Sequence, residues 1–310
     1  MYDRPAMMTS YPRDGRSRSV RKTPWFEEGL LAFQRARPTA PAMYLCPICL
    51  HGFSTSDGLS IDHFPPQSLG GRSAVLTCTE CNNHAGSELE ADMKPAESLY
   101  DFAAGEMSEP APGEYAIGGH TLKANIQATG NAVLIFGAQG AGNPAVEQAL
   151  KERLDERSEE GAWADFEIKL SFGTHRCEDA LAGWLRSAYL AVFSAWGYSY
   201  IFRSPLNVVR EQIAQPRSKI LRVFSLTLPK PEFDEPHISL IDQPPSLAGH
   251  LFVGKGRHAV FLPGLHGNGL YEELARQSDA GLEANVSAVK EIPWPTRPRY
   301  ELDIALSDGS

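Results

Sequence analysis

The hydrophobic positions of this chain follow two different spacings, one typical of helices and one typical of strands. Apolar residues recur every three or four positions over 25–37, 82–93, 144–157, 178–196 and 205–214, which predicts helices there. Alternation predicts strands over 59–63, 164–172, 219–228, 237–242, 249–254, 257–262 and 298–305, and a hairpin over 121–136 that turns at Gly130-Asn131. Because helices and strands mix without any repeat, the pattern predicts an α+β fold.

Local composition divides the chain into four segments. Residues 1–24 are rich in Arg, Ser and Pro and lack periodicity, which predicts a disordered basic arm. Residues 25–100 hold a compact cysteine-rich module, and 101–114 have the composition of a linker. Residues 115–310 form a mixed α+β domain of unassigned role, for which positioning of a substrate is one option.

Overall composition narrows the class of protein. With 310 residues, 42% of them hydrophobic, the chain can bury a large core without help from metals. The formal net charge of -9 argues against a surface coated with nucleic-acid-binding charge, but it permits a local basic patch. The N-terminus has no apolar signal segment, and Arg186 interrupts the most apolar stretch, 182–201. We therefore expect a cytoplasmic protein without a membrane partner; its oligomeric state is left open.

Four of the five cysteines form two C-x-x-C pairs, Cys46 with Cys49 and Cys78 with Cys81. Each pair directs two thiolates at one point, and two pairs complete a tetrahedron with Zn–S distances of ~2.3 Å. One pair alone is compatible with a redox dithiol, and the same cysteines could instead form disulfides or stay inert thiols. Two pairs around a short segment, in a chain without an export signal, favour a closed structural Zn²⁺ site.

Between the cysteine pairs lies a strand that ends in Asp62 and His63. Neighbouring residues of a strand point in opposite directions, so one side chain can ligate a metal while the other addresses a substrate. Pro65-Pro66 ends the strand, Gly70-Gly71 lets the chain turn back, and the helix after the second pair is expected to bring Asn82 near Asp62. The alternative is an ordinary strand end that carries two polar residues.

Together these motifs resemble the zinc-containing branch of the HNH endonuclease family. The matching positions are Cys46, Cys49, Asp62, His63, Pro66, Ser68, Gly70, Gly71, Cys78, Cys81, Asn82 and Gly86. The resemblance implies a zinc-stapled ββα-metal finger. It further implies a metal-dependent endonuclease that hydrolyses phosphodiester bonds in nucleic acid, with DNA as the preferred expectation. It also implies that His63 is the general base for water, and that Asp62 and Asn82 are catalytic residues that ligate a single Mg²⁺ or Mn²⁺ ion.

The chemistry of these residue types suits that activity. An imidazole with an ordinary pKa of ~6.5 accepts a proton from water near neutrality. A hard divalent ion held by oxygen ligands neutralises charge on a phosphate. Two positions depart from the family pattern, because Ser73 stands where the family has a middle Asn and Ala85 where a Lys is common.

A surface for the nucleic acid has to lie outside the cysteine-rich module, since residues 41–100 carry two Lys/Arg and seven Asp/Glu. The best candidate is the basic segment 202–230, with Arg203, Arg210, Arg217, Lys219 and Arg222 as nucleic-acid-binding residues. A solvated helix and strand face explains these charges equally well. The alternative function is a non-catalytic zinc module that binds nucleic acid or a protein partner, in which Ser73 and Ala85 mark a lost active site.

Overall fold

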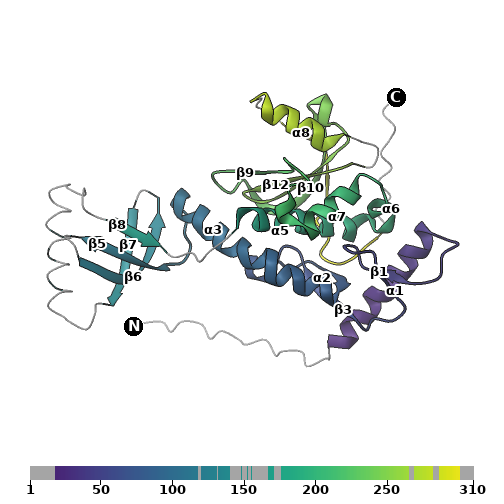
Figure 1. Ribbon diagram of the computed structural model, residues 1–310, viewed down its shortest axis with the longest axis horizontal. Coiled ribbons are helices and arrows are strands. Elements are labelled where there is room, and N and C mark those ends of the chain that lie inside the picture. Colours follow the sequence, from purple (N-terminus) through teal and green to yellow (C-terminus); the bar gives the residue numbers. More distant parts are fainter. Residues whose placement is uncertain are drawn as a thin grey trace, which may run out of the picture.

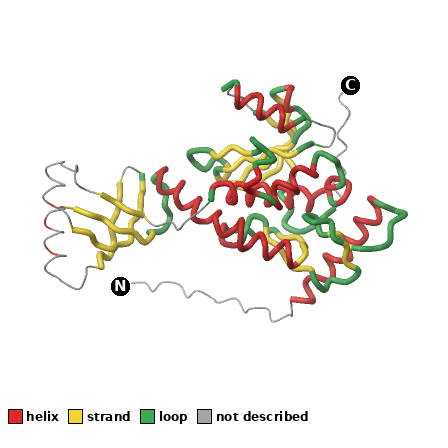
Figure 2. Tube along the Cα trace, viewed as in Figure 1, coloured by secondary structure: helices red, strands yellow, loops and turns green. Residues whose placement is uncertain are grey.

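The computed structural model describes residues 18–117, 120–130, 132–139, 148, 152, 155, 167–170, 176–264, 269–281 and 286–300. Figures 1 and 2 show a larger mixed body and a smaller β-sheet unit, which projects from the end of helix α3. The helices are α1 (Arg18–Ala36), α2 (Thr79–His84), α3 (Glu90–Ala104), α5 (Cys177–Trp196), α6 (Tyr198–Ile201), α7 (Leu206–Ala214) and α8 (Leu270–Asp279). The α+β class predicted from the sequence is confirmed.

The strands form two short hairpins and two larger antiparallel sheets. The hairpins are β1 (Tyr44–Leu45) with β2 (Gly52–Phe53), and β3 (Leu59–His63) with β4 (Ala74–Cys78). One sheet has the order β7-β6-β5-β8, from β5 (Ala111–Ile117), β6 (His120–Thr129), β7 (Ala132–Gln139) and β8 (Glu167–Leu170). The other has the order β13-β10-β11-β12-β9, from β9 (Ser225–Thr227), β10 (Phe233–Gln243), β11 (Leu251–Gly256), β12 (His258–Leu262) and β13 (Ser287–Ile292).

Strand β3 of the β3–β4 hairpin is the strand predicted at 59–63, and it ends in Asp62 and His63. The chain turns back through Gly70, whose φ is 75°, and through Gly71, where a Cβ atom would lie 1.7 Å from the carbonyl oxygen of Pro65. Both positions therefore require glycine. After β4 the chain runs through α2, a π-helical turn (Ala85–Leu89) and α3, so helical structure extends well beyond the predicted 82–93.

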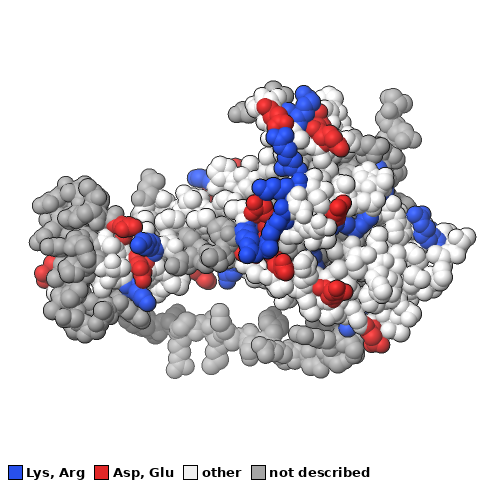
Figure 3. Space-filling view, in the orientation of Figure 1, with Lys and Arg blue, Asp and Glu red and all other residues white. Residues whose placement is uncertain are grey.

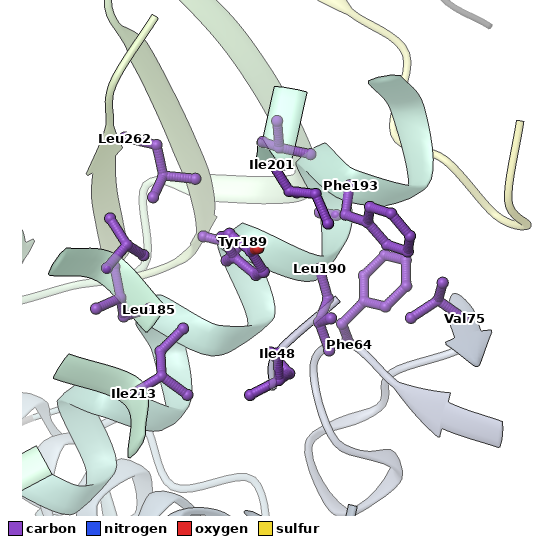
Figure 4. Packing of buried hydrophobic residues seen from close by; sticks show 14 of the residues in the cluster. Ile48, Phe64, Val75, Leu185, Tyr189, Leu190, Phe193, Ile201, Ile213 and Leu262 are labelled. Carbon is purple, nitrogen blue, oxygen red and sulfur yellow. The ribbon is translucent and has the colours of Figure 1, made fainter. Parts of the chain in front are cut away.

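Helix α5 forms the centre of the molecule. It is buried on nearly all sides, which is more than the one apolar face that its spacing predicts. Gly183 lets α3 approach closely, because a Cβ there would lie 2.5 Å from the Sδ atom of Met93. Figure 4 shows Leu185, Tyr189, Leu190 and Phe193 of this helix, with Leu262 of β12 on one side and Ile48, Phe64 and Val75 of the cysteine-rich module on the other. The helix thus joins the module to the large C-terminal sheet.

This packing corrects the predicted domain boundaries. One hydrophobic core contains buried residues from Phe26 to Tyr300, so segment 25–100 does not have a core separate from the later residues. The sheet of β5 to β8 has a small core of its own around Tyr115 and Ile126. The predicted linker is shorter than 101–114, because α3 continues to Ala104 and β5 begins at Ala111. Residues 18–24 belong to α1 rather than to a disordered arm, and residues 1–17 lie outside the described part.

The remaining predicted elements agree with the structure to different degrees. The helices at 178–196 and 205–214, the three strands within 237–262 and the hairpin with Thr129 paired to Ala132 are confirmed. Within the strand predicted at 219–228, only Ser225–Thr227 pairs in a sheet. Residues 298–300, at the start of the strand predicted at 298–305, form no strand. Residues 301–305 and most of the helix predicted at 144–157 lie outside the described part. Among the described helices, none has the length and apolar content that a membrane crossing requires.

Candidate functional site

The four cysteines of the two C-x-x-C pairs come together at one end of the β3–β4 hairpin. The sulfur atoms of Cys46, Cys49, Cys78 and Cys81 all lie within 4.8 Å of one another. The first pair lies on the turn between β1 and β2, where Leu50 adopts a left-handed φ of 60°. The second pair spans the end of β4 and the first turn of α2. This cluster could hold a metal ion, as the spacing predicts.

Contacts within the cluster lower the pKa of two of its four thiols. Sulfur contacts with Cys46 lower the pKa of Cys49 to about 5 and that of Cys78 to about 6, while the same contacts raise the pKa of Cys46. Backbone amides also donate to two of the sulfurs, from Cys78 to Cys46 at 3.3 Å and from Cys81 to Cys78 at 3.4 Å. Thiolates are the form that binds metal, so Cys49 and Cys78 are the two cysteines most readily available as ligands.

His63 lies at the end of β3 and lines a cavity of about 920 Å³. Burial lowers the pKa of the imidazole, although the nearby Asp62 carboxylate opposes this shift. The ring is therefore neutral at pH 7, the form that a general base needs. The side-chain amide nitrogen of Gln67 lies 3.0 Å from Nε2 of His63 and orients the ring.

Asp62 points away from that cavity, into the core beneath α5. Its side chain is 1% exposed, and both of its oxygens are bonded to the guanidinium of Arg186, one of them at 3.1 Å. The Thr77 hydroxyl donates to the same carboxylate at 2.7 Å, and Arg186 also contacts Glu90 at 3.3 Å. A buried carboxylate needs such a partner, because an isolated charge in the core is very costly.

Asn82 is the other predicted metal ligand, and it does line the His63 cavity. Its amide nitrogen lies 3.5 Å from the carbonyl oxygen of Ile61 in β3, so α2 and the strand hold it beside His63. The structure thus brings His63 and Asn82 together and leaves Asp62 on the opposite side of the strand. Adjacent strand residues point to opposite faces, and here α5 covers the face that bears Asp62.

Two cationic side chains also line this cavity, together with the indole of Trp25. Lys22, from α1, donates to the carbonyl oxygen of Leu59 at 2.9 Å and keeps two further N–H donors. Arg72, from the turn before β4, is exposed and has no ion-pair partner among the described residues. No Asp or Glu side chain lines the cavity within the described ranges, so it is suited to an anion.

The basic surface predicted at 202–230 is not found. The prediction is wrong for Arg210, which is 8% exposed and donates to the carbonyl oxygen of Ile201 at 2.7 Å. Arg203 donates to the carbonyl oxygen of Gly264. The other three are paired with carboxylates: Arg217 with Asp179, Lys219 with Glu178 and Arg222 with Asp279. On the face seen in Figure 3, red side chains lie next to several of the blue ones.

Arg186, Lys22 and Arg72 are site residues that the motif did not identify. Arg186 had a signal in the sequence, since a single arginine interrupts the apolar stretch 182–201 and such a residue needs a buried partner. Its partner is Asp62, 124 positions earlier, and no local pattern identifies that pair. Ser73, at the position of the family's middle Asn, is buried and accepts a hydrogen bond from the indole nitrogen of Trp294 at 2.8 Å. Ala85 is buried in the π-helical turn.

Comparison with models of protein families, with curated proteins and with solved structures finds no match to this chain. Its function therefore has to be inferred from the residues of the site.

Proposed function

We propose that this protein is a nuclease that hydrolyses phosphodiester bonds in nucleic acid, with His63 as the general base. One observation carries the proposal: a single open cavity joins a neutral imidazole to two cationic side chains and to Asn82. A base for water and positive charge for a phosphate are the two requirements of this hydrolysis.

In the proposed reaction the substrate phosphate lies between Lys22 and Arg72, which stabilise the negative charge that increases on its oxygens. An attacking water displaces the Gln67 amide from Nε2 of His63 and gives its proton to that nitrogen. The water oxygen bonds to phosphorus as the bond to the leaving oxygen breaks, and the leaving oxygen takes up a proton from solvent. The ring then releases its proton and the base is restored.

The catalytic Mg²⁺ or Mn²⁺ expected from the resemblance does not fit the site in this arrangement. A hard divalent ion prefers carboxylate ligands, yet Asp62 is bonded to Arg186, and no other carboxylate among the described residues lines the cavity. Asn82 by itself supplies one neutral oxygen. The positive charge in this cavity comes from Lys22 and Arg72, and no step of the proposed reaction passes through a divalent ion.

Zinc is the metal that we propose for the four-cysteine cluster. Four thiolates in a tetrahedral arrangement leave no open position for a substrate, so the ion would be structural. It would tie the turn between β1 and β2 to the start of α2. The cluster adjoins the hairpin that carries His63 and the helix that carries Asn82, so the metal would fix both sides of the cavity.

A cleavage assay with a matched histidine control tests the proposal. We expect His63→Ala to slow hydrolysis of plasmid DNA or RNA by about 10²–10⁴-fold, the usual contribution of a general base. His84→Ala should keep the wild-type rate, because His84 does not line the cavity. The assay is run with Mg²⁺, with Mn²⁺ and with a chelator. Equal cleavage by wild type and His63→Ala, or no cleavage in all three conditions, would contradict the mechanism.

The pH dependence of the same reaction gives a second prediction. Burial lowers the pKa of His63, so the imidazole loses its proton below the ordinary value of ~6.5. Activity should therefore rise with pH through a midpoint below ~6.5 and stay level through neutrality. The quantity to measure is kcat/KM between pH 4.5 and 8. A midpoint above ~6.5 would show that His63 is not the titrating base.

The ion pair between Asp62 and Arg186 favours a second candidate, a zinc module that binds nucleic acid without cutting it. In that case the carboxylate has become part of the core instead of the active site. Binding of an oligonucleotide without any His63-dependent cleavage is the result that distinguishes this candidate from the nuclease.

A further inference from the structure

Residues 293–300 form a segment near the C-terminus that we call the strap. A second hollow lies between this strap and α1, the two segments that also reach the His63 cavity. It has a volume of about 440 Å³ and is lined by Glu28, Leu31, Arg35, Arg297, Pro298, Arg299 and Tyr300. Two chain segments connect it to the first cavity. Thr296 lines the His63 cavity and Arg297 lines the hollow, while α1 contributes Lys22 and Trp25 to the first and Arg35 to the second.

The strap is held at both ends by buried contacts. At its start, the indole of Trp294 donates to Ser73 at 2.8 Å and its ring lies 5.9 Å from that of Phe64. At its end, the backbone amides of Arg299 and Tyr300 donate to the carbonyl oxygen of Ser194 at 2.8 and 3.2 Å. Pro298 and Tyr300 are buried, whereas Arg297 and Arg299 between them are exposed. The strap therefore presents two arginines to solvent from a fixed backbone.

The charge along this path is strongly positive. Arg72 and Lys22 lie at the His63 end, and Arg297, Arg299 and Arg35 lie at the other, with Glu28 as the carboxylate that lines the hollow. The guanidinium groups of Arg297 and Arg299 have no ion-pair partner within the described part of the chain. They differ in this from Arg217, Lys219 and Arg222, each of which is paired with a carboxylate.

We propose that these five cations form a track along which a nucleic-acid strand lies, and that the strand passes from the strap into the His63 cavity. This inference rests on the proposed function and names the surface that holds its substrate. Arginine forks match phosphate oxygens, and the half-buried indole of Trp25 offers a stacking surface for a base. From Lys22 to Arg35, α1 rises about 20 Å at ~1.5 Å per residue. At about 3.4 Å per nucleotide, this length corresponds to about six nucleotides.

The test compares two variants that lower the net charge equally. Arg297→Gln with Arg299→Gln removes the strap cations, and Arg217→Gln with Arg222→Gln removes two paired ones. We expect the strap variant to bind a twelve-nucleotide strand about 10-fold more weakly. The slope of log K against log salt should fall by about 1.4, at ~0.7 per phosphate contact. The control variant should remain near wild type. Fluorescence anisotropy gives both quantities, and thermal melting checks that both variants fold.

Three results would overturn the track: equal weakening by both variants, unchanged binding by the strap variant, or equally tight binding of poly-glutamate of the same charge. Hydrolysis of the small diester bis(p-nitrophenyl) phosphate shows whether the track or the proposed nuclease function has failed. So small a substrate needs only the His63 cavity and not the track. His63-dependent hydrolysis that the strap variant retains, together with unaltered strand binding, would reject the track alone. Loss of His63 dependence with this small diester would reject the proposed function.

Discussion

Replacing Cys78 with serine is expected to release the metal and to lower the melting temperature by more than about 10 °C. Structural zinc supplies about 10–16 kcal/mol to isolated zinc-finger peptides. The loss should be smaller here, because Cys46 and Cys78 also lie in the large core that α5 organises. A loss of about 5 kcal/mol would still shift the melting point by more than ~10 °C, at about 2–4 °C per kcal/mol for a large domain.

Cys177 provides a matched control for this variant. It is exposed at the first residue of α5 and does not belong to the four-cysteine cluster. Cys177→Ser should keep about one zinc per chain and the wild-type melting curve, whereas Cys78→Ser should hold much less zinc. Elemental analysis and calorimetry measure the two quantities. Equal zinc content and equal melting in the three proteins would show that the thiolates do not hold a structural ion.

The second large effect is expected from Arg186→Met. This change leaves the Asp62 carboxylate buried with the Thr77 hydroxyl as its remaining described partner. Removing one partner of a buried pair costs about 3–5 kcal/mol, because the other charge stays desolvated. Glu90 is less affected, since it reaches solvent. The free energy of unfolding in urea, measured above pH 6 so that carboxylates remain charged, gives the loss.

A double variant distinguishes loss of the ion pair from loss of packing. Asp62→Leu with Arg186→Met replaces both charges by apolar groups and should recover most of the stability lost by Arg186→Met, since such swaps are often neutral. If the double variant is as unstable as the single one, the packing of the Arg186 side chain matters more than its charge. If Arg186→Met loses less than about 1 kcal/mol, the pair is not the buried contact described above.

Much of the fold could be predicted because its signals are local. The apolar pattern of 178–196 and the capping Gly197 predict α5 within one residue of its observed start. The glycines at 70 and 71 predict the turn of the β3–β4 hairpin. Strand β13 and the short extent of β9 were missed, because both strands depend on pairing with partners that are distant in the sequence.

The candidate site divides in the same way. Spacing alone predicts that Cys46, Cys49, Cys78 and Cys81 meet, since each C-x-x-C turn directs two thiolates at one point. Spacing also places Asn82 beside the strand that ends in His63. It fails for Asp62, whose role depends on what covers the other face of the strand. It fails for the basic segment 202–230 as well, because each cation there finds its own partner in the fold.

The sequence by itself determined the four-cysteine cluster, the strand with its neighbouring Asp62 and His63, and the apolar central helix. These depend on residue spacing, which the covalent chain imposes. Only the tertiary structure decided that Arg186 binds Asp62 in the core and that Arg297 and Arg299 line a hollow together with Arg35 of α1. Contacts between residues more than one hundred positions apart depend on how whole helices and sheets pack their apolar faces together. No local sequence pattern specifies that packing.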